Sequence, residues 1–232
     1  MNIHKFEVDF LNKYDIVISL DEAGRGPWAG PVTIGAILFN SEDLESIVNL
    51  SSLNDSKKVS EKKRFILEKK ILEIIKYSEI SDVDVETIDR INILEATKLG
   101  IINCLDKLLN NLQLDSINFS SIGILIDGKF NNLETLVNQL ASFQNKTFEI
   151  KTVIDGDALC PSISAASILA KEHRDKIMRE IHKQFPEYGF DKHKGYGTKL
   201  HQDRLKLFGP TILHRKSFKP IKEMLIASIL NN

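Results

Sequence analysis

One short stretch constrains the fold more than any other: an apolar run over residues 16–20 that ends in two carboxylates, Asp21 and Glu22. A run of this kind predicts a buried strand. Three glycines follow before residue 31, with Arg25 between the first two. Charge at a strand end, followed by glycines that let the backbone approach closely, is the usual design of a site for a charged ligand. The alternative is a strand that runs into an acidic, glycine-rich loop, but no turn residues precede Asp21.

The remaining pattern predicts an α/β fold. Residues 31–39 form a second apolar run, and the short acidic connection predicts that the two strands are antiparallel neighbours. A polar loop is expected after residue 39. Further strands are predicted over residues 80–85, 122–126 and 148–154, and helices over 61–77, 87–112, 133–143, 161–182, 198–209 and 218–230. Ser60 and Thr198 are the expected N-caps of the helices that follow them. Small residues in the 87–112 helix, such as Gly100 and Cys104, predict close packing against the sheet.

Length and composition fit one globular domain. The 232 residues are 42% hydrophobic and 27% charged, which is ordinary for such a domain. We expect a single domain over residues 1–232, with an N-terminal extension over about 1–14 and a helical portion over about 184–232. Two cysteines without metal-type spacing fit a reducing cytosol. The chain shows no signal peptide and no run of membrane-spanning length, so a cytoplasmic monomer without membrane contact is expected.

Positive charge is concentrated in one part of the chain. Residues 171–222 contain fourteen Lys and Arg against six Asp and Glu, an excess of eight positive charges, although the whole chain has a net charge of −1. Five of the six histidines also lie there. Such an asymmetry is expected of a protein that binds a polyanion such as nucleic acid. The alternative is that many of these charges belong to solvated helix faces.

Carboxylates follow three of the predicted strands: Asp21 with Glu22, Asp127, and Asp157. If these strands are neighbours, the four acids share a small space, and a bound cation relieves their repulsion. Oxygen ligands without His or Cys favour Mg²⁺ or Mn²⁺ over zinc. Two such ions can stabilise the attacking and leaving oxygens of a phosphoryl displacement. Taken alone, Asp127 indicates a tight turn, and either Asp155 or Asp157 could be the ligand.

The opening stretch also resembles a family motif. Residues 21–32, Asp-Glu-Ala-Gly-Arg-Gly-Pro-Trp-Ala-Gly-Pro-Val, are similar to the first motif of type 2 ribonuclease H, the bacterial ribonuclease HII branch. Other segments similar to the family follow in the same order. They are Asp55-Ser56-Lys57-Lys58, Ile91-Asn92-Ile93-Leu94-Glu95-Ala96-Thr97, Asp127-Gly128, Gly156-Asp157, the run from Pro161 to Lys171, and His193-Lys194-Gly195-Tyr196. The likeness covers roughly residues 15–218.

The resemblance implies a ribonuclease H-like α/β fold: a central mixed β-sheet flanked by helices, with a helical C-terminal portion that completes the nucleic-acid groove. It implies metal-bound, catalytic carboxylates at four positions: Asp21, Glu22, Asp127 and Asp157. By position alone, it thus favours Asp157 over Asp155.

The glycine loop and one tyrosine match family contacts to the sugar. Gly24, Arg25 and Gly26 are similar to the loop that recognises the 2′-hydroxyl through backbone groups, and this hydroxyl is what separates RNA from DNA. Tyr196 matches the tyrosine that stacks on the sugar after the scissile ribonucleotide. The alternative for Tyr196 is a loop side chain half buried against a helix.

Further residues match contacts to backbone phosphates, which position a duplex without reading its sequence. They are Lys57, Lys58, Ser164 and Lys171. Arg215 and Lys216, in the basic span, are expected to extend this grip. Lysines on helix faces are more often simply solvated.

Two residues depart from the family pattern. Trp28 stands where an aliphatic residue is more common, and Gly197 stands where a proline commonly follows the tyrosine. Neither residue touches a proposed metal ligand, so these departures are expected to affect the preference for an RNA-to-DNA junction and not activity itself. The Gly-Arg-Gly loop, with only about fourteen residues before the first strand, favours type 2 over type 3, which typically carries an extra N-terminal domain.

The sequence therefore predicts an endonuclease that hydrolyses the RNA strand of RNA/DNA hybrids and cuts 5′ of ribonucleotides embedded in duplex DNA. By the resemblance, the products carry 3′-hydroxyl and 5′-phosphate ends, Mn²⁺ or Mg²⁺ acts in a two-metal-ion mechanism, and the role is ribonucleotide removal in DNA replication and repair. Three alternatives are a junction resolvase of the same fold, a non-catalytic hybrid-binding module, and a small-phosphate hydrolase. The last leaves the basic span unexplained.

Overall fold

A five-stranded sheet in the order β3-β2-β1-β4-β5 forms the centre of the protein. The computed structural model describes residues 2–50 and 60–230. Strand β1 (Ile16–Ala23) pairs antiparallel with β2 (Val32–Phe39) and parallel with β4 (Ser121–Asp127). At the two edges, β3 (Tyr77–Val83) pairs antiparallel with β2, and β5 (Thr147–Val153) pairs parallel with β4. The predicted mixed sheet and its antiparallel first pair are confirmed.

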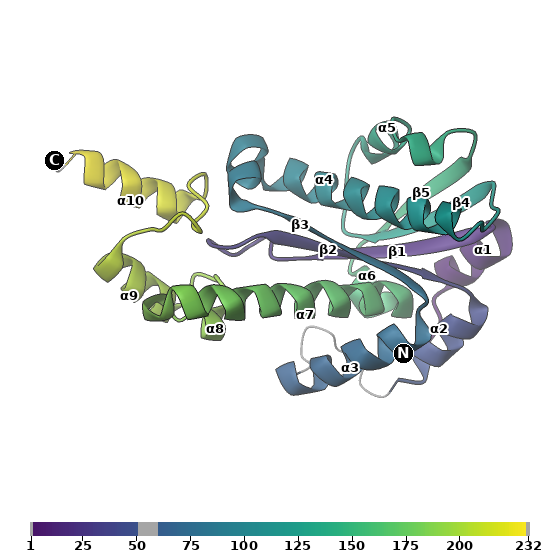
Figure 1. The fold of residues 1–232 in the computed structure, drawn as a ribbon, viewed down its shortest axis with the longest axis horizontal. Coiled ribbons are helices and arrows are strands. Elements are labelled where there is room, and N and C mark those ends of the chain that lie inside the picture. Colours follow the sequence, from purple (N-terminus) through teal and green to yellow (C-terminus); the bar gives the residue numbers. More distant parts are fainter. Residues whose placement is uncertain (1, 51–59, 231–232) are drawn as a thin grey trace.

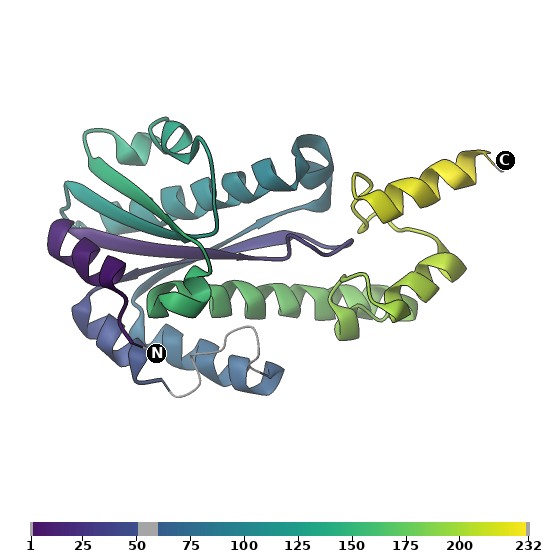
Figure 2. The same cartoon turned by 180° about the vertical axis from the view of Figure 1, so that it is seen from behind.

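Helices cover both faces of the sheet. In Figure 1, α4 (Val85–Leu114) lies on one face and α7 (Pro161–Gln184) on the other, and Figure 2 shows the same two layers from behind. Within β1, Ile18 and Leu20 belong to the core cluster that includes α4 residues, whereas Val17 belongs to the cluster that includes α7 residues. Because both faces are buried, the central strands read as continuous apolar runs.

Small residues allow the layers to approach closely. A Cβ added to Gly35 of β2 would lie 2.5 Å from the Ala166 carbonyl oxygen of α7. One added to Gly100 of α4 would lie 2.2 Å from Ile34 Cδ1. A close-packed interior has no room for a methyl group at such positions. The predicted close packing of the 87–112 helix on the sheet is confirmed.

The prediction of a polar loop after residue 39 was wrong. This segment contains α2 (Ser41–Val48), which begins with a capping box between Asn40 and Asp43. Leu44 and Ile47 are buried against the sheet layer that includes α7. Two apolar side chains three residues apart anchor this helix. The sequence predicted a loop because polar residues outnumber them in this segment.

Residues before the first strand form α1 (Lys5–Lys13), which buries Phe10 and Glu7. The Glu7 carboxylate accepts hydrogen bonds from the Ser162 backbone N–H (2.8 Å) and hydroxyl (2.6 Å) at the start of α7. Burial raises the pKa of Glu7. The segment predicted as an N-terminal extension thus joins α7 through a buried carboxylate.

Several other boundaries differ from prediction. The remaining helices between the strands are α3 (Glu61–Ile74), α5 (Leu133–Val137) and a 3₁₀ turn (Ala141–Phe143), and α6 (Gly156–Leu159) follows β5. The single helix expected over 133–143 is therefore divided in two. Strand β5 ends at Val153, so the expectation that Asp157 lies at a strand end was wrong: it lies on α6.

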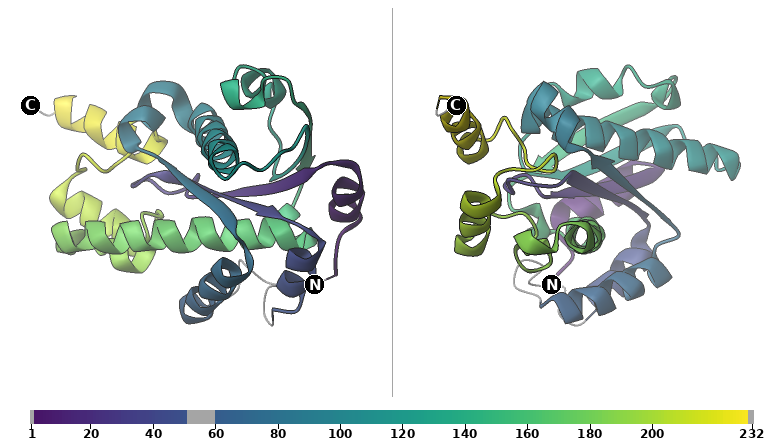
Figure 3. Two further views of the ribbon diagram at one scale, coloured as in Figure 1. Left: turned by 45° about the vertical axis from the view of Figure 1, so that its right-hand side comes forward. Right: turned by 60° about the vertical axis from the view of Figure 1, so that its left-hand side comes forward.

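The C-terminal helices lie beyond one end of the sheet (Figure 3). They are a 3₁₀ turn (Pro186–Tyr188), α8 (Phe190–His193), α9 (Lys199–Phe208) and α10 (Lys219–Leu230). Their own small core includes Tyr188, Phe190 and Leu205, and it takes in Ala29 from the β1–β2 connection. An isolated β-bridge joins Ala29 to His214. None of the helices in the described part of the chain is both long and apolar enough to span a membrane.

Candidate active site

Three of the predicted carboxylates line one cavity of about 400 Å³: Asp21 and Glu22 from β1, and Asp127 from the end of β4. The pairing of β1 with β4 stops at Leu20, whereas its pairing with β2 continues to Ala23. The edge of β1 that faces β4 is therefore free beyond Leu20. This local loss of pairing lets two adjacent residues of one strand face the same space, although strand neighbours normally point to opposite faces.

The electrostatics of this cavity favour a bound cation. Asp21 is only 5% exposed. Burial, followed by repulsion from Glu22 and Asp127, raises its pKa well above the usual range, and a hydrogen bond from Ser167 opposes the shift. Burial also raises the pKa of Glu22, against the effect of Arg25, whose Nη1 lies 3.2 Å from Glu22 Oε1. Positive charge in the cavity would stabilise the ionised carboxylates together.

The two remaining acidic candidates have different environments. Asp155 is exposed and stands at the N-cap of α6 with a positive φ of 54°. Asp157 is 2% exposed and is not among the residues that line the cavity. Its neighbour Gly156 contacts the site directly, because the Gly156 N–H donates to Asp127 Oδ1 at 2.6 Å.

The glycines of the first motif serve two different purposes. Gly24 has a φ of +93°, and a Cβ there would lie 2.1 Å from Arg174 Nε. A Cβ on Gly26 would meet only Tyr196 Cε1, at an ordinary 3.8 Å, across the cavity. Gly24 is therefore required by the packing of the protein itself, whereas Gly26 leaves space open on the cavity side.

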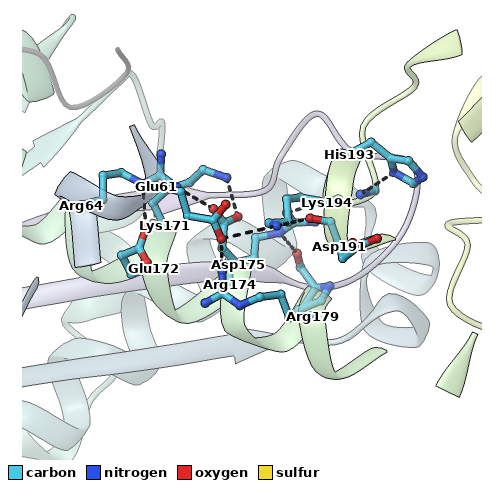
Figure 4. Close-up of polar contacts among 12 residues, drawn as sticks. Glu61, Arg64, Lys171, Glu172, Arg174, Asp175, Arg179, Asp191, His193 and Lys194 are labelled. Carbon is cyan, nitrogen blue, oxygen red and sulfur yellow. Dashed lines mark hydrogen bonds and ion pairs between the residues drawn. The ribbon is translucent and has the colours of Figure 1, made fainter. Parts of the chain in front are cut away.

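Lys171 and Tyr196 line the same cavity as the carboxylates. Tyr196 is 42% exposed, and Lys171 Nζ lies 5.9 Å from its ring centroid. The buried Asp175 holds Lys171 Nζ at 2.6 Å and also holds Arg64 Nη2 at 2.8 Å (Figure 4). Arg64, which the sequence interpretation missed, lines the same cavity. Two cations thus reach the cavity from adjacent helices.

The other predicted phosphate contacts are placed differently. Lys57 and Lys58 lie outside the described residues. Ser164 is fully buried in α7 and does not line the cavity, whereas Ser167, three residues later, does. The sequence also contained Ser167 at the same small-residue helix start, and this second serine was the available signal for the cavity contact.

Arg215 requires a correction. The prediction that it extends a phosphate grip was wrong, because its side chain is fully buried and binds backbone carbonyls of the glycine loop. Arg174 is equally buried. No sequence signal separated these two arginines from the exposed cations around them. Lys216, by contrast, is exposed.

The two departures from the family pattern fit each other. Trp28 and Gly197 are in contact, and a Cβ on Gly197 would lie 2.2 Å from Trp28 Cζ2. The indole thus occupies the space that a side chain at 197 would need. The loop that carries Tyr196 is also joined to Trp28 through a hydrogen bond from the Trp28 N–H to the Gly195 carbonyl, at 2.8 Å.

The donor set of the cavity fits a hard divalent ion. Its acidic lining groups are all carboxylates, and neither imidazole nor thiol is among the described residues around it. In the described part of the chain, no three acidic, histidine or cysteine side chains already stand as a complete metal cluster. Asp21, Glu22 and Asp127 nevertheless line one cavity, so their carboxylates share the space that such an ion would need.

Comparison with solved structures agrees with the fold. Ribonuclease H2 from Pyrococcus horikoshii superposes with a TM-score of 0.73 at 22% identity, covering 91% of this chain and 98% of that one. Bst-RNase HIII in complex with Mn²⁺ superposes with a TM-score of 0.71 at 16% identity, covering 94% of this chain and 72% of that one. The predicted ribonuclease H-like fold is confirmed.

Sequence comparison identifies the family. Ribonuclease HII of Chlamydia muridarum is 42% identical over 211 residues, covering 90% of this chain and 85% of the relative. Ribonuclease HII of Wolbachia sp. subsp. Brugia malayi is 39% identical over 206 residues, covering 89% of each chain. The family model for ribonuclease HII matches residues 18–221. With its fold and acidic cavity also in agreement, the chain belongs to the ribonuclease HII family and is an endonuclease of the ribonuclease H type.

Proposed function

We propose that this endonuclease hydrolyses the RNA strand of RNA/DNA hybrids and cuts duplex DNA on the 5′ side of embedded ribonucleotides, leaving 3′-hydroxyl and 5′-phosphate ends. One observation carries the proposal. Asp21, Glu22 and Asp127 line the same cavity as the Gly24–Gly26 loop, Lys171 and Tyr196. Groups suited to a scissile phosphate and groups suited to a ribose thus face one space. Ribonucleotide removal in replication and repair is the role that this reaction serves.

Each group has a task that follows from its chemistry. The Gly24–Gly26 backbone receives the 2′-hydroxyl, because Gly26 leaves its cavity side open and a main chain can both donate to and accept from a hydroxyl. Tyr196 presents a partly exposed ring to the next sugar. Lys171 and Arg64 neutralise backbone phosphates, and Asp175 orients both cations.

The metal cofactor is part of this proposal. Asp21, Glu22 and Asp127, with Asp157 as the fourth acid, would hold Mg²⁺ or Mn²⁺, which are the ions that carboxylate oxygens select. When bound, two ions supply the charge that activates water and stabilises the leaving 3′ oxygen. The solved Bst-RNase HIII complex with Mn²⁺ supports a divalent ion in this fold.

The test uses a labelled DNA duplex that contains one ribonucleotide, beside an all-DNA duplex of the same sequence. Each is incubated with Mg²⁺, with Mn²⁺ or with a chelator. The expected result is metal-dependent cleavage 5′ of the ribonucleotide and no cleavage of the control. Cleavage of both duplexes would remove the assigned role of the Gly24–Gly26 loop. Binding without cleavage under either metal would instead favour a hybrid-binding module.

A further inference from the structure

Arg215 lies beneath the glycine loop and is a donor to its backbone. Its Nε donates to the Gly30 carbonyl at 3.0 Å, and its Nη1 donates to the Arg25 carbonyl at 3.0 Å. Its Nη2 donates to the carbonyls of Gly24 (2.6 Å), Gly30 (2.8 Å) and Pro31 (3.0 Å). One guanidinium therefore joins the two ends of the loop, where it leaves β1 and where it enters β2.

Arg174 connects the same loop to the tyrosine loop. From α7, its Nε donates to the Pro31 carbonyl at 2.9 Å and its Nη2 to the Ala29 carbonyl at 3.0 Å. Its Nη1 donates to the Lys194 carbonyl at 2.9 Å, two residues before Tyr196 (Figure 4). The two loops that face the ribose are thus held by one side chain.

In the described part of the chain, both guanidinium groups are buried among backbone carbonyls and not beside carboxylates. Arg174 and Arg215 are 0% exposed, and within the described residues neither forms a salt bridge with a carboxylate. Burial lowers the pKa of Arg215 to about 9, still above neutrality, so the charge is retained. A buried charge is costly unless its hydrogen bonds are satisfied, and here loop carbonyls satisfy them. The desolvation of two buried arginines therefore indicates that the protein requires this particular loop conformation.

The glycines of the motif match this arrangement. A Cβ on Gly24 would overlap the Arg174 side chain, with Nε at 2.1 Å and Cδ at 2.5 Å. A Cβ on Gly30 would lie 3.3 Å from Arg174 Nη2 and 2.4 Å from Met178 Sδ. The absent side chain at Gly24 therefore leaves the space that Arg174 fills, whereas the space at Gly30 is filled mainly by Met178 beside Arg174.

We infer that Arg174 and Arg215 are positioning residues for ribonucleotide recognition: they fix the Gly24–Gly26 backbone, and through Lys194 the Tyr196 loop, in the geometry that receives the ribose. This inference rests on the proposed function, because it needs the loop to read a 2′-hydroxyl. The arginines act through the backbone and do not touch the substrate. Phosphate contacts supply most of the affinity for a duplex, so loss of an arginine affects the cleavage step more than binding.

The first test compares Arg215→Ala with the parent chain on the single-ribonucleotide duplex. We expect kcat to fall about tenfold or more, because misplacement of a positioned group by about 1 Å can reduce the rate about 100-fold. Duplex Kd, measured by anisotropy in chelator, should change less than about twofold. The control is Arg90→Ala, an exposed arginine of α4 outside the cavity, which should leave kcat and Kd unchanged.

A second readout separates positioning from general stability. Millimolar methylguanidinium should raise both the Tm and the kcat of Arg215→Ala by refilling the carbonyl cage, and should raise neither in the parent chain or in Arg90→Ala. If Arg215→Ala does not fold, the same kinetics are measured on Arg215→Lys, whose single ammonium cannot reach all four carbonyls at once. Reduced kcat at an unchanged Kd remains the expected result.

Two results would overturn the inference. One is a folded Arg215→Ala or Arg215→Lys variant with parental kcat on the ribonucleotide duplex. The other is a folded Arg215→Ala variant that methylguanidinium restores in Tm but not in kcat, since that describes a purely structural arginine. A parent chain that fails to cut the ribonucleotide duplex is a different outcome and removes the proposed function itself.

Discussion

At the scale of single residues, the site is defined by repulsion between its acids. Asp21 is buried, and the charges of Glu22 and Asp127 add to the effect of burial on its pKa. A group that is costly to ionise where it stands destabilises the folded chain at neutral pH, and its retention indicates a function other than stability.

Asp21→Asn should abolish cleavage and leave Tm unchanged or higher, because the change removes one charge from a mutually repelling group. The measurement pairs a thermal melt with the single-ribonucleotide cleavage assay. Cleavage at the parental rate would exclude Asp21 from the mechanism. A large fall in Tm would show that its carboxylate stabilises the fold.

The two glycines that flank Arg25 should respond differently to the same change. Gly26→Ala should fold normally and lose activity, because the nearest atom to its Cβ is 3.8 Å away and the cavity lies beside it. Gly24→Ala should be unstable, because its φ is +93° and its Cβ meets Arg174. Urea unfolding and cleavage assays on both variants test this contrast, which fails if both lose stability equally.

Trp28 and Gly197 form a coupled pair. Gly197→Ala should cost about 1–3 kcal/mol of unfolding free energy in the parent chain, because a Cβ would lie 2.2 Å from the indole. In a Trp28→Leu background the same change should cost less than about 0.5 kcal/mol. A double-mutant cycle in urea measures the coupling, and strictly additive losses would contradict it.

At the scale of elements, α4 is two helical segments joined at Asn92. This residue has φ 68° and ψ 166°, far from helical values. Its Oδ1 accepts from the N–H groups of Leu94 (2.9 Å) and Glu95 (3.1 Å), as an N-cap does. The shorter segment before it carries Asp89, which accepts from the N–H groups of Lys216 and Ser217, both at 2.8 Å. The kink thus directs the first segment of α4, residues 85–91, toward the residues just before α10.

Asn92→Ala should therefore destabilise the protein by about 1–3 kcal/mol, because it removes the cap and because alanine adopts a positive φ less readily than asparagine. Asn92→Gly should be milder, since glycine tolerates that conformation. Urea unfolding of both variants provides the measurement. An alanine variant as stable as the parent would contradict the assigned role of this residue.

At the scale of the whole molecule, three buried histidines join the C-terminal helices to the tyrosine loop. The Thr211 N–H donates to His214 Nδ1 (2.9 Å), so His214 Nε2 carries the proton and donates to His201 Nε2 (3.0 Å). His201 Nδ1 then donates to the Tyr196 carbonyl (3.0 Å). His193 stacks on His201, with ring centroids 4.3 Å apart. All contacts are satisfied only while the rings are neutral.

Burial lowers the pKa of His201 to about 4 and that of His214 to about 3, and it also lowers the pKa of His193. The unfolded chain therefore takes up protons below about pH 6.5 while the folded chain does not, so stability falls as pH drops from 6.5 toward 4. Each such histidine contributes about 1.4 kcal/mol per pH unit. His214→Gln should flatten this slope by about that amount; an identical slope in urea melts would refute the assignment.

Much of the architecture could be predicted from local pattern. A strand was predicted at each of the five strands of the sheet, although the one predicted over 80–85 lies at Tyr77–Val83. Thr198 caps α9 as expected, accepting from the His201 N–H at 3.4 Å. Ser60 holds the N-cap position of α3, but its side chain makes no capping hydrogen bond. The missed α2 depends on two apolar residues in a polar segment. Such short helices are stabilised by tertiary packing, which a local pattern does not contain.

The sequence by itself determined the acids, the glycine loop and the family, because these depend on residue type and spacing along the chain. Only the tertiary structure decided which cations face the cavity and which lie beneath it. Lys171 and Arg174 are three residues apart on α7, yet one lines the cavity and the other is fully buried under the loop. Arg215, from the C-terminal part of the chain, is buried under the same loop as Arg174. Burial is a property of the packed fold, and an arginine in a charged segment carries no local sign of whether water or carbonyl oxygens will surround it.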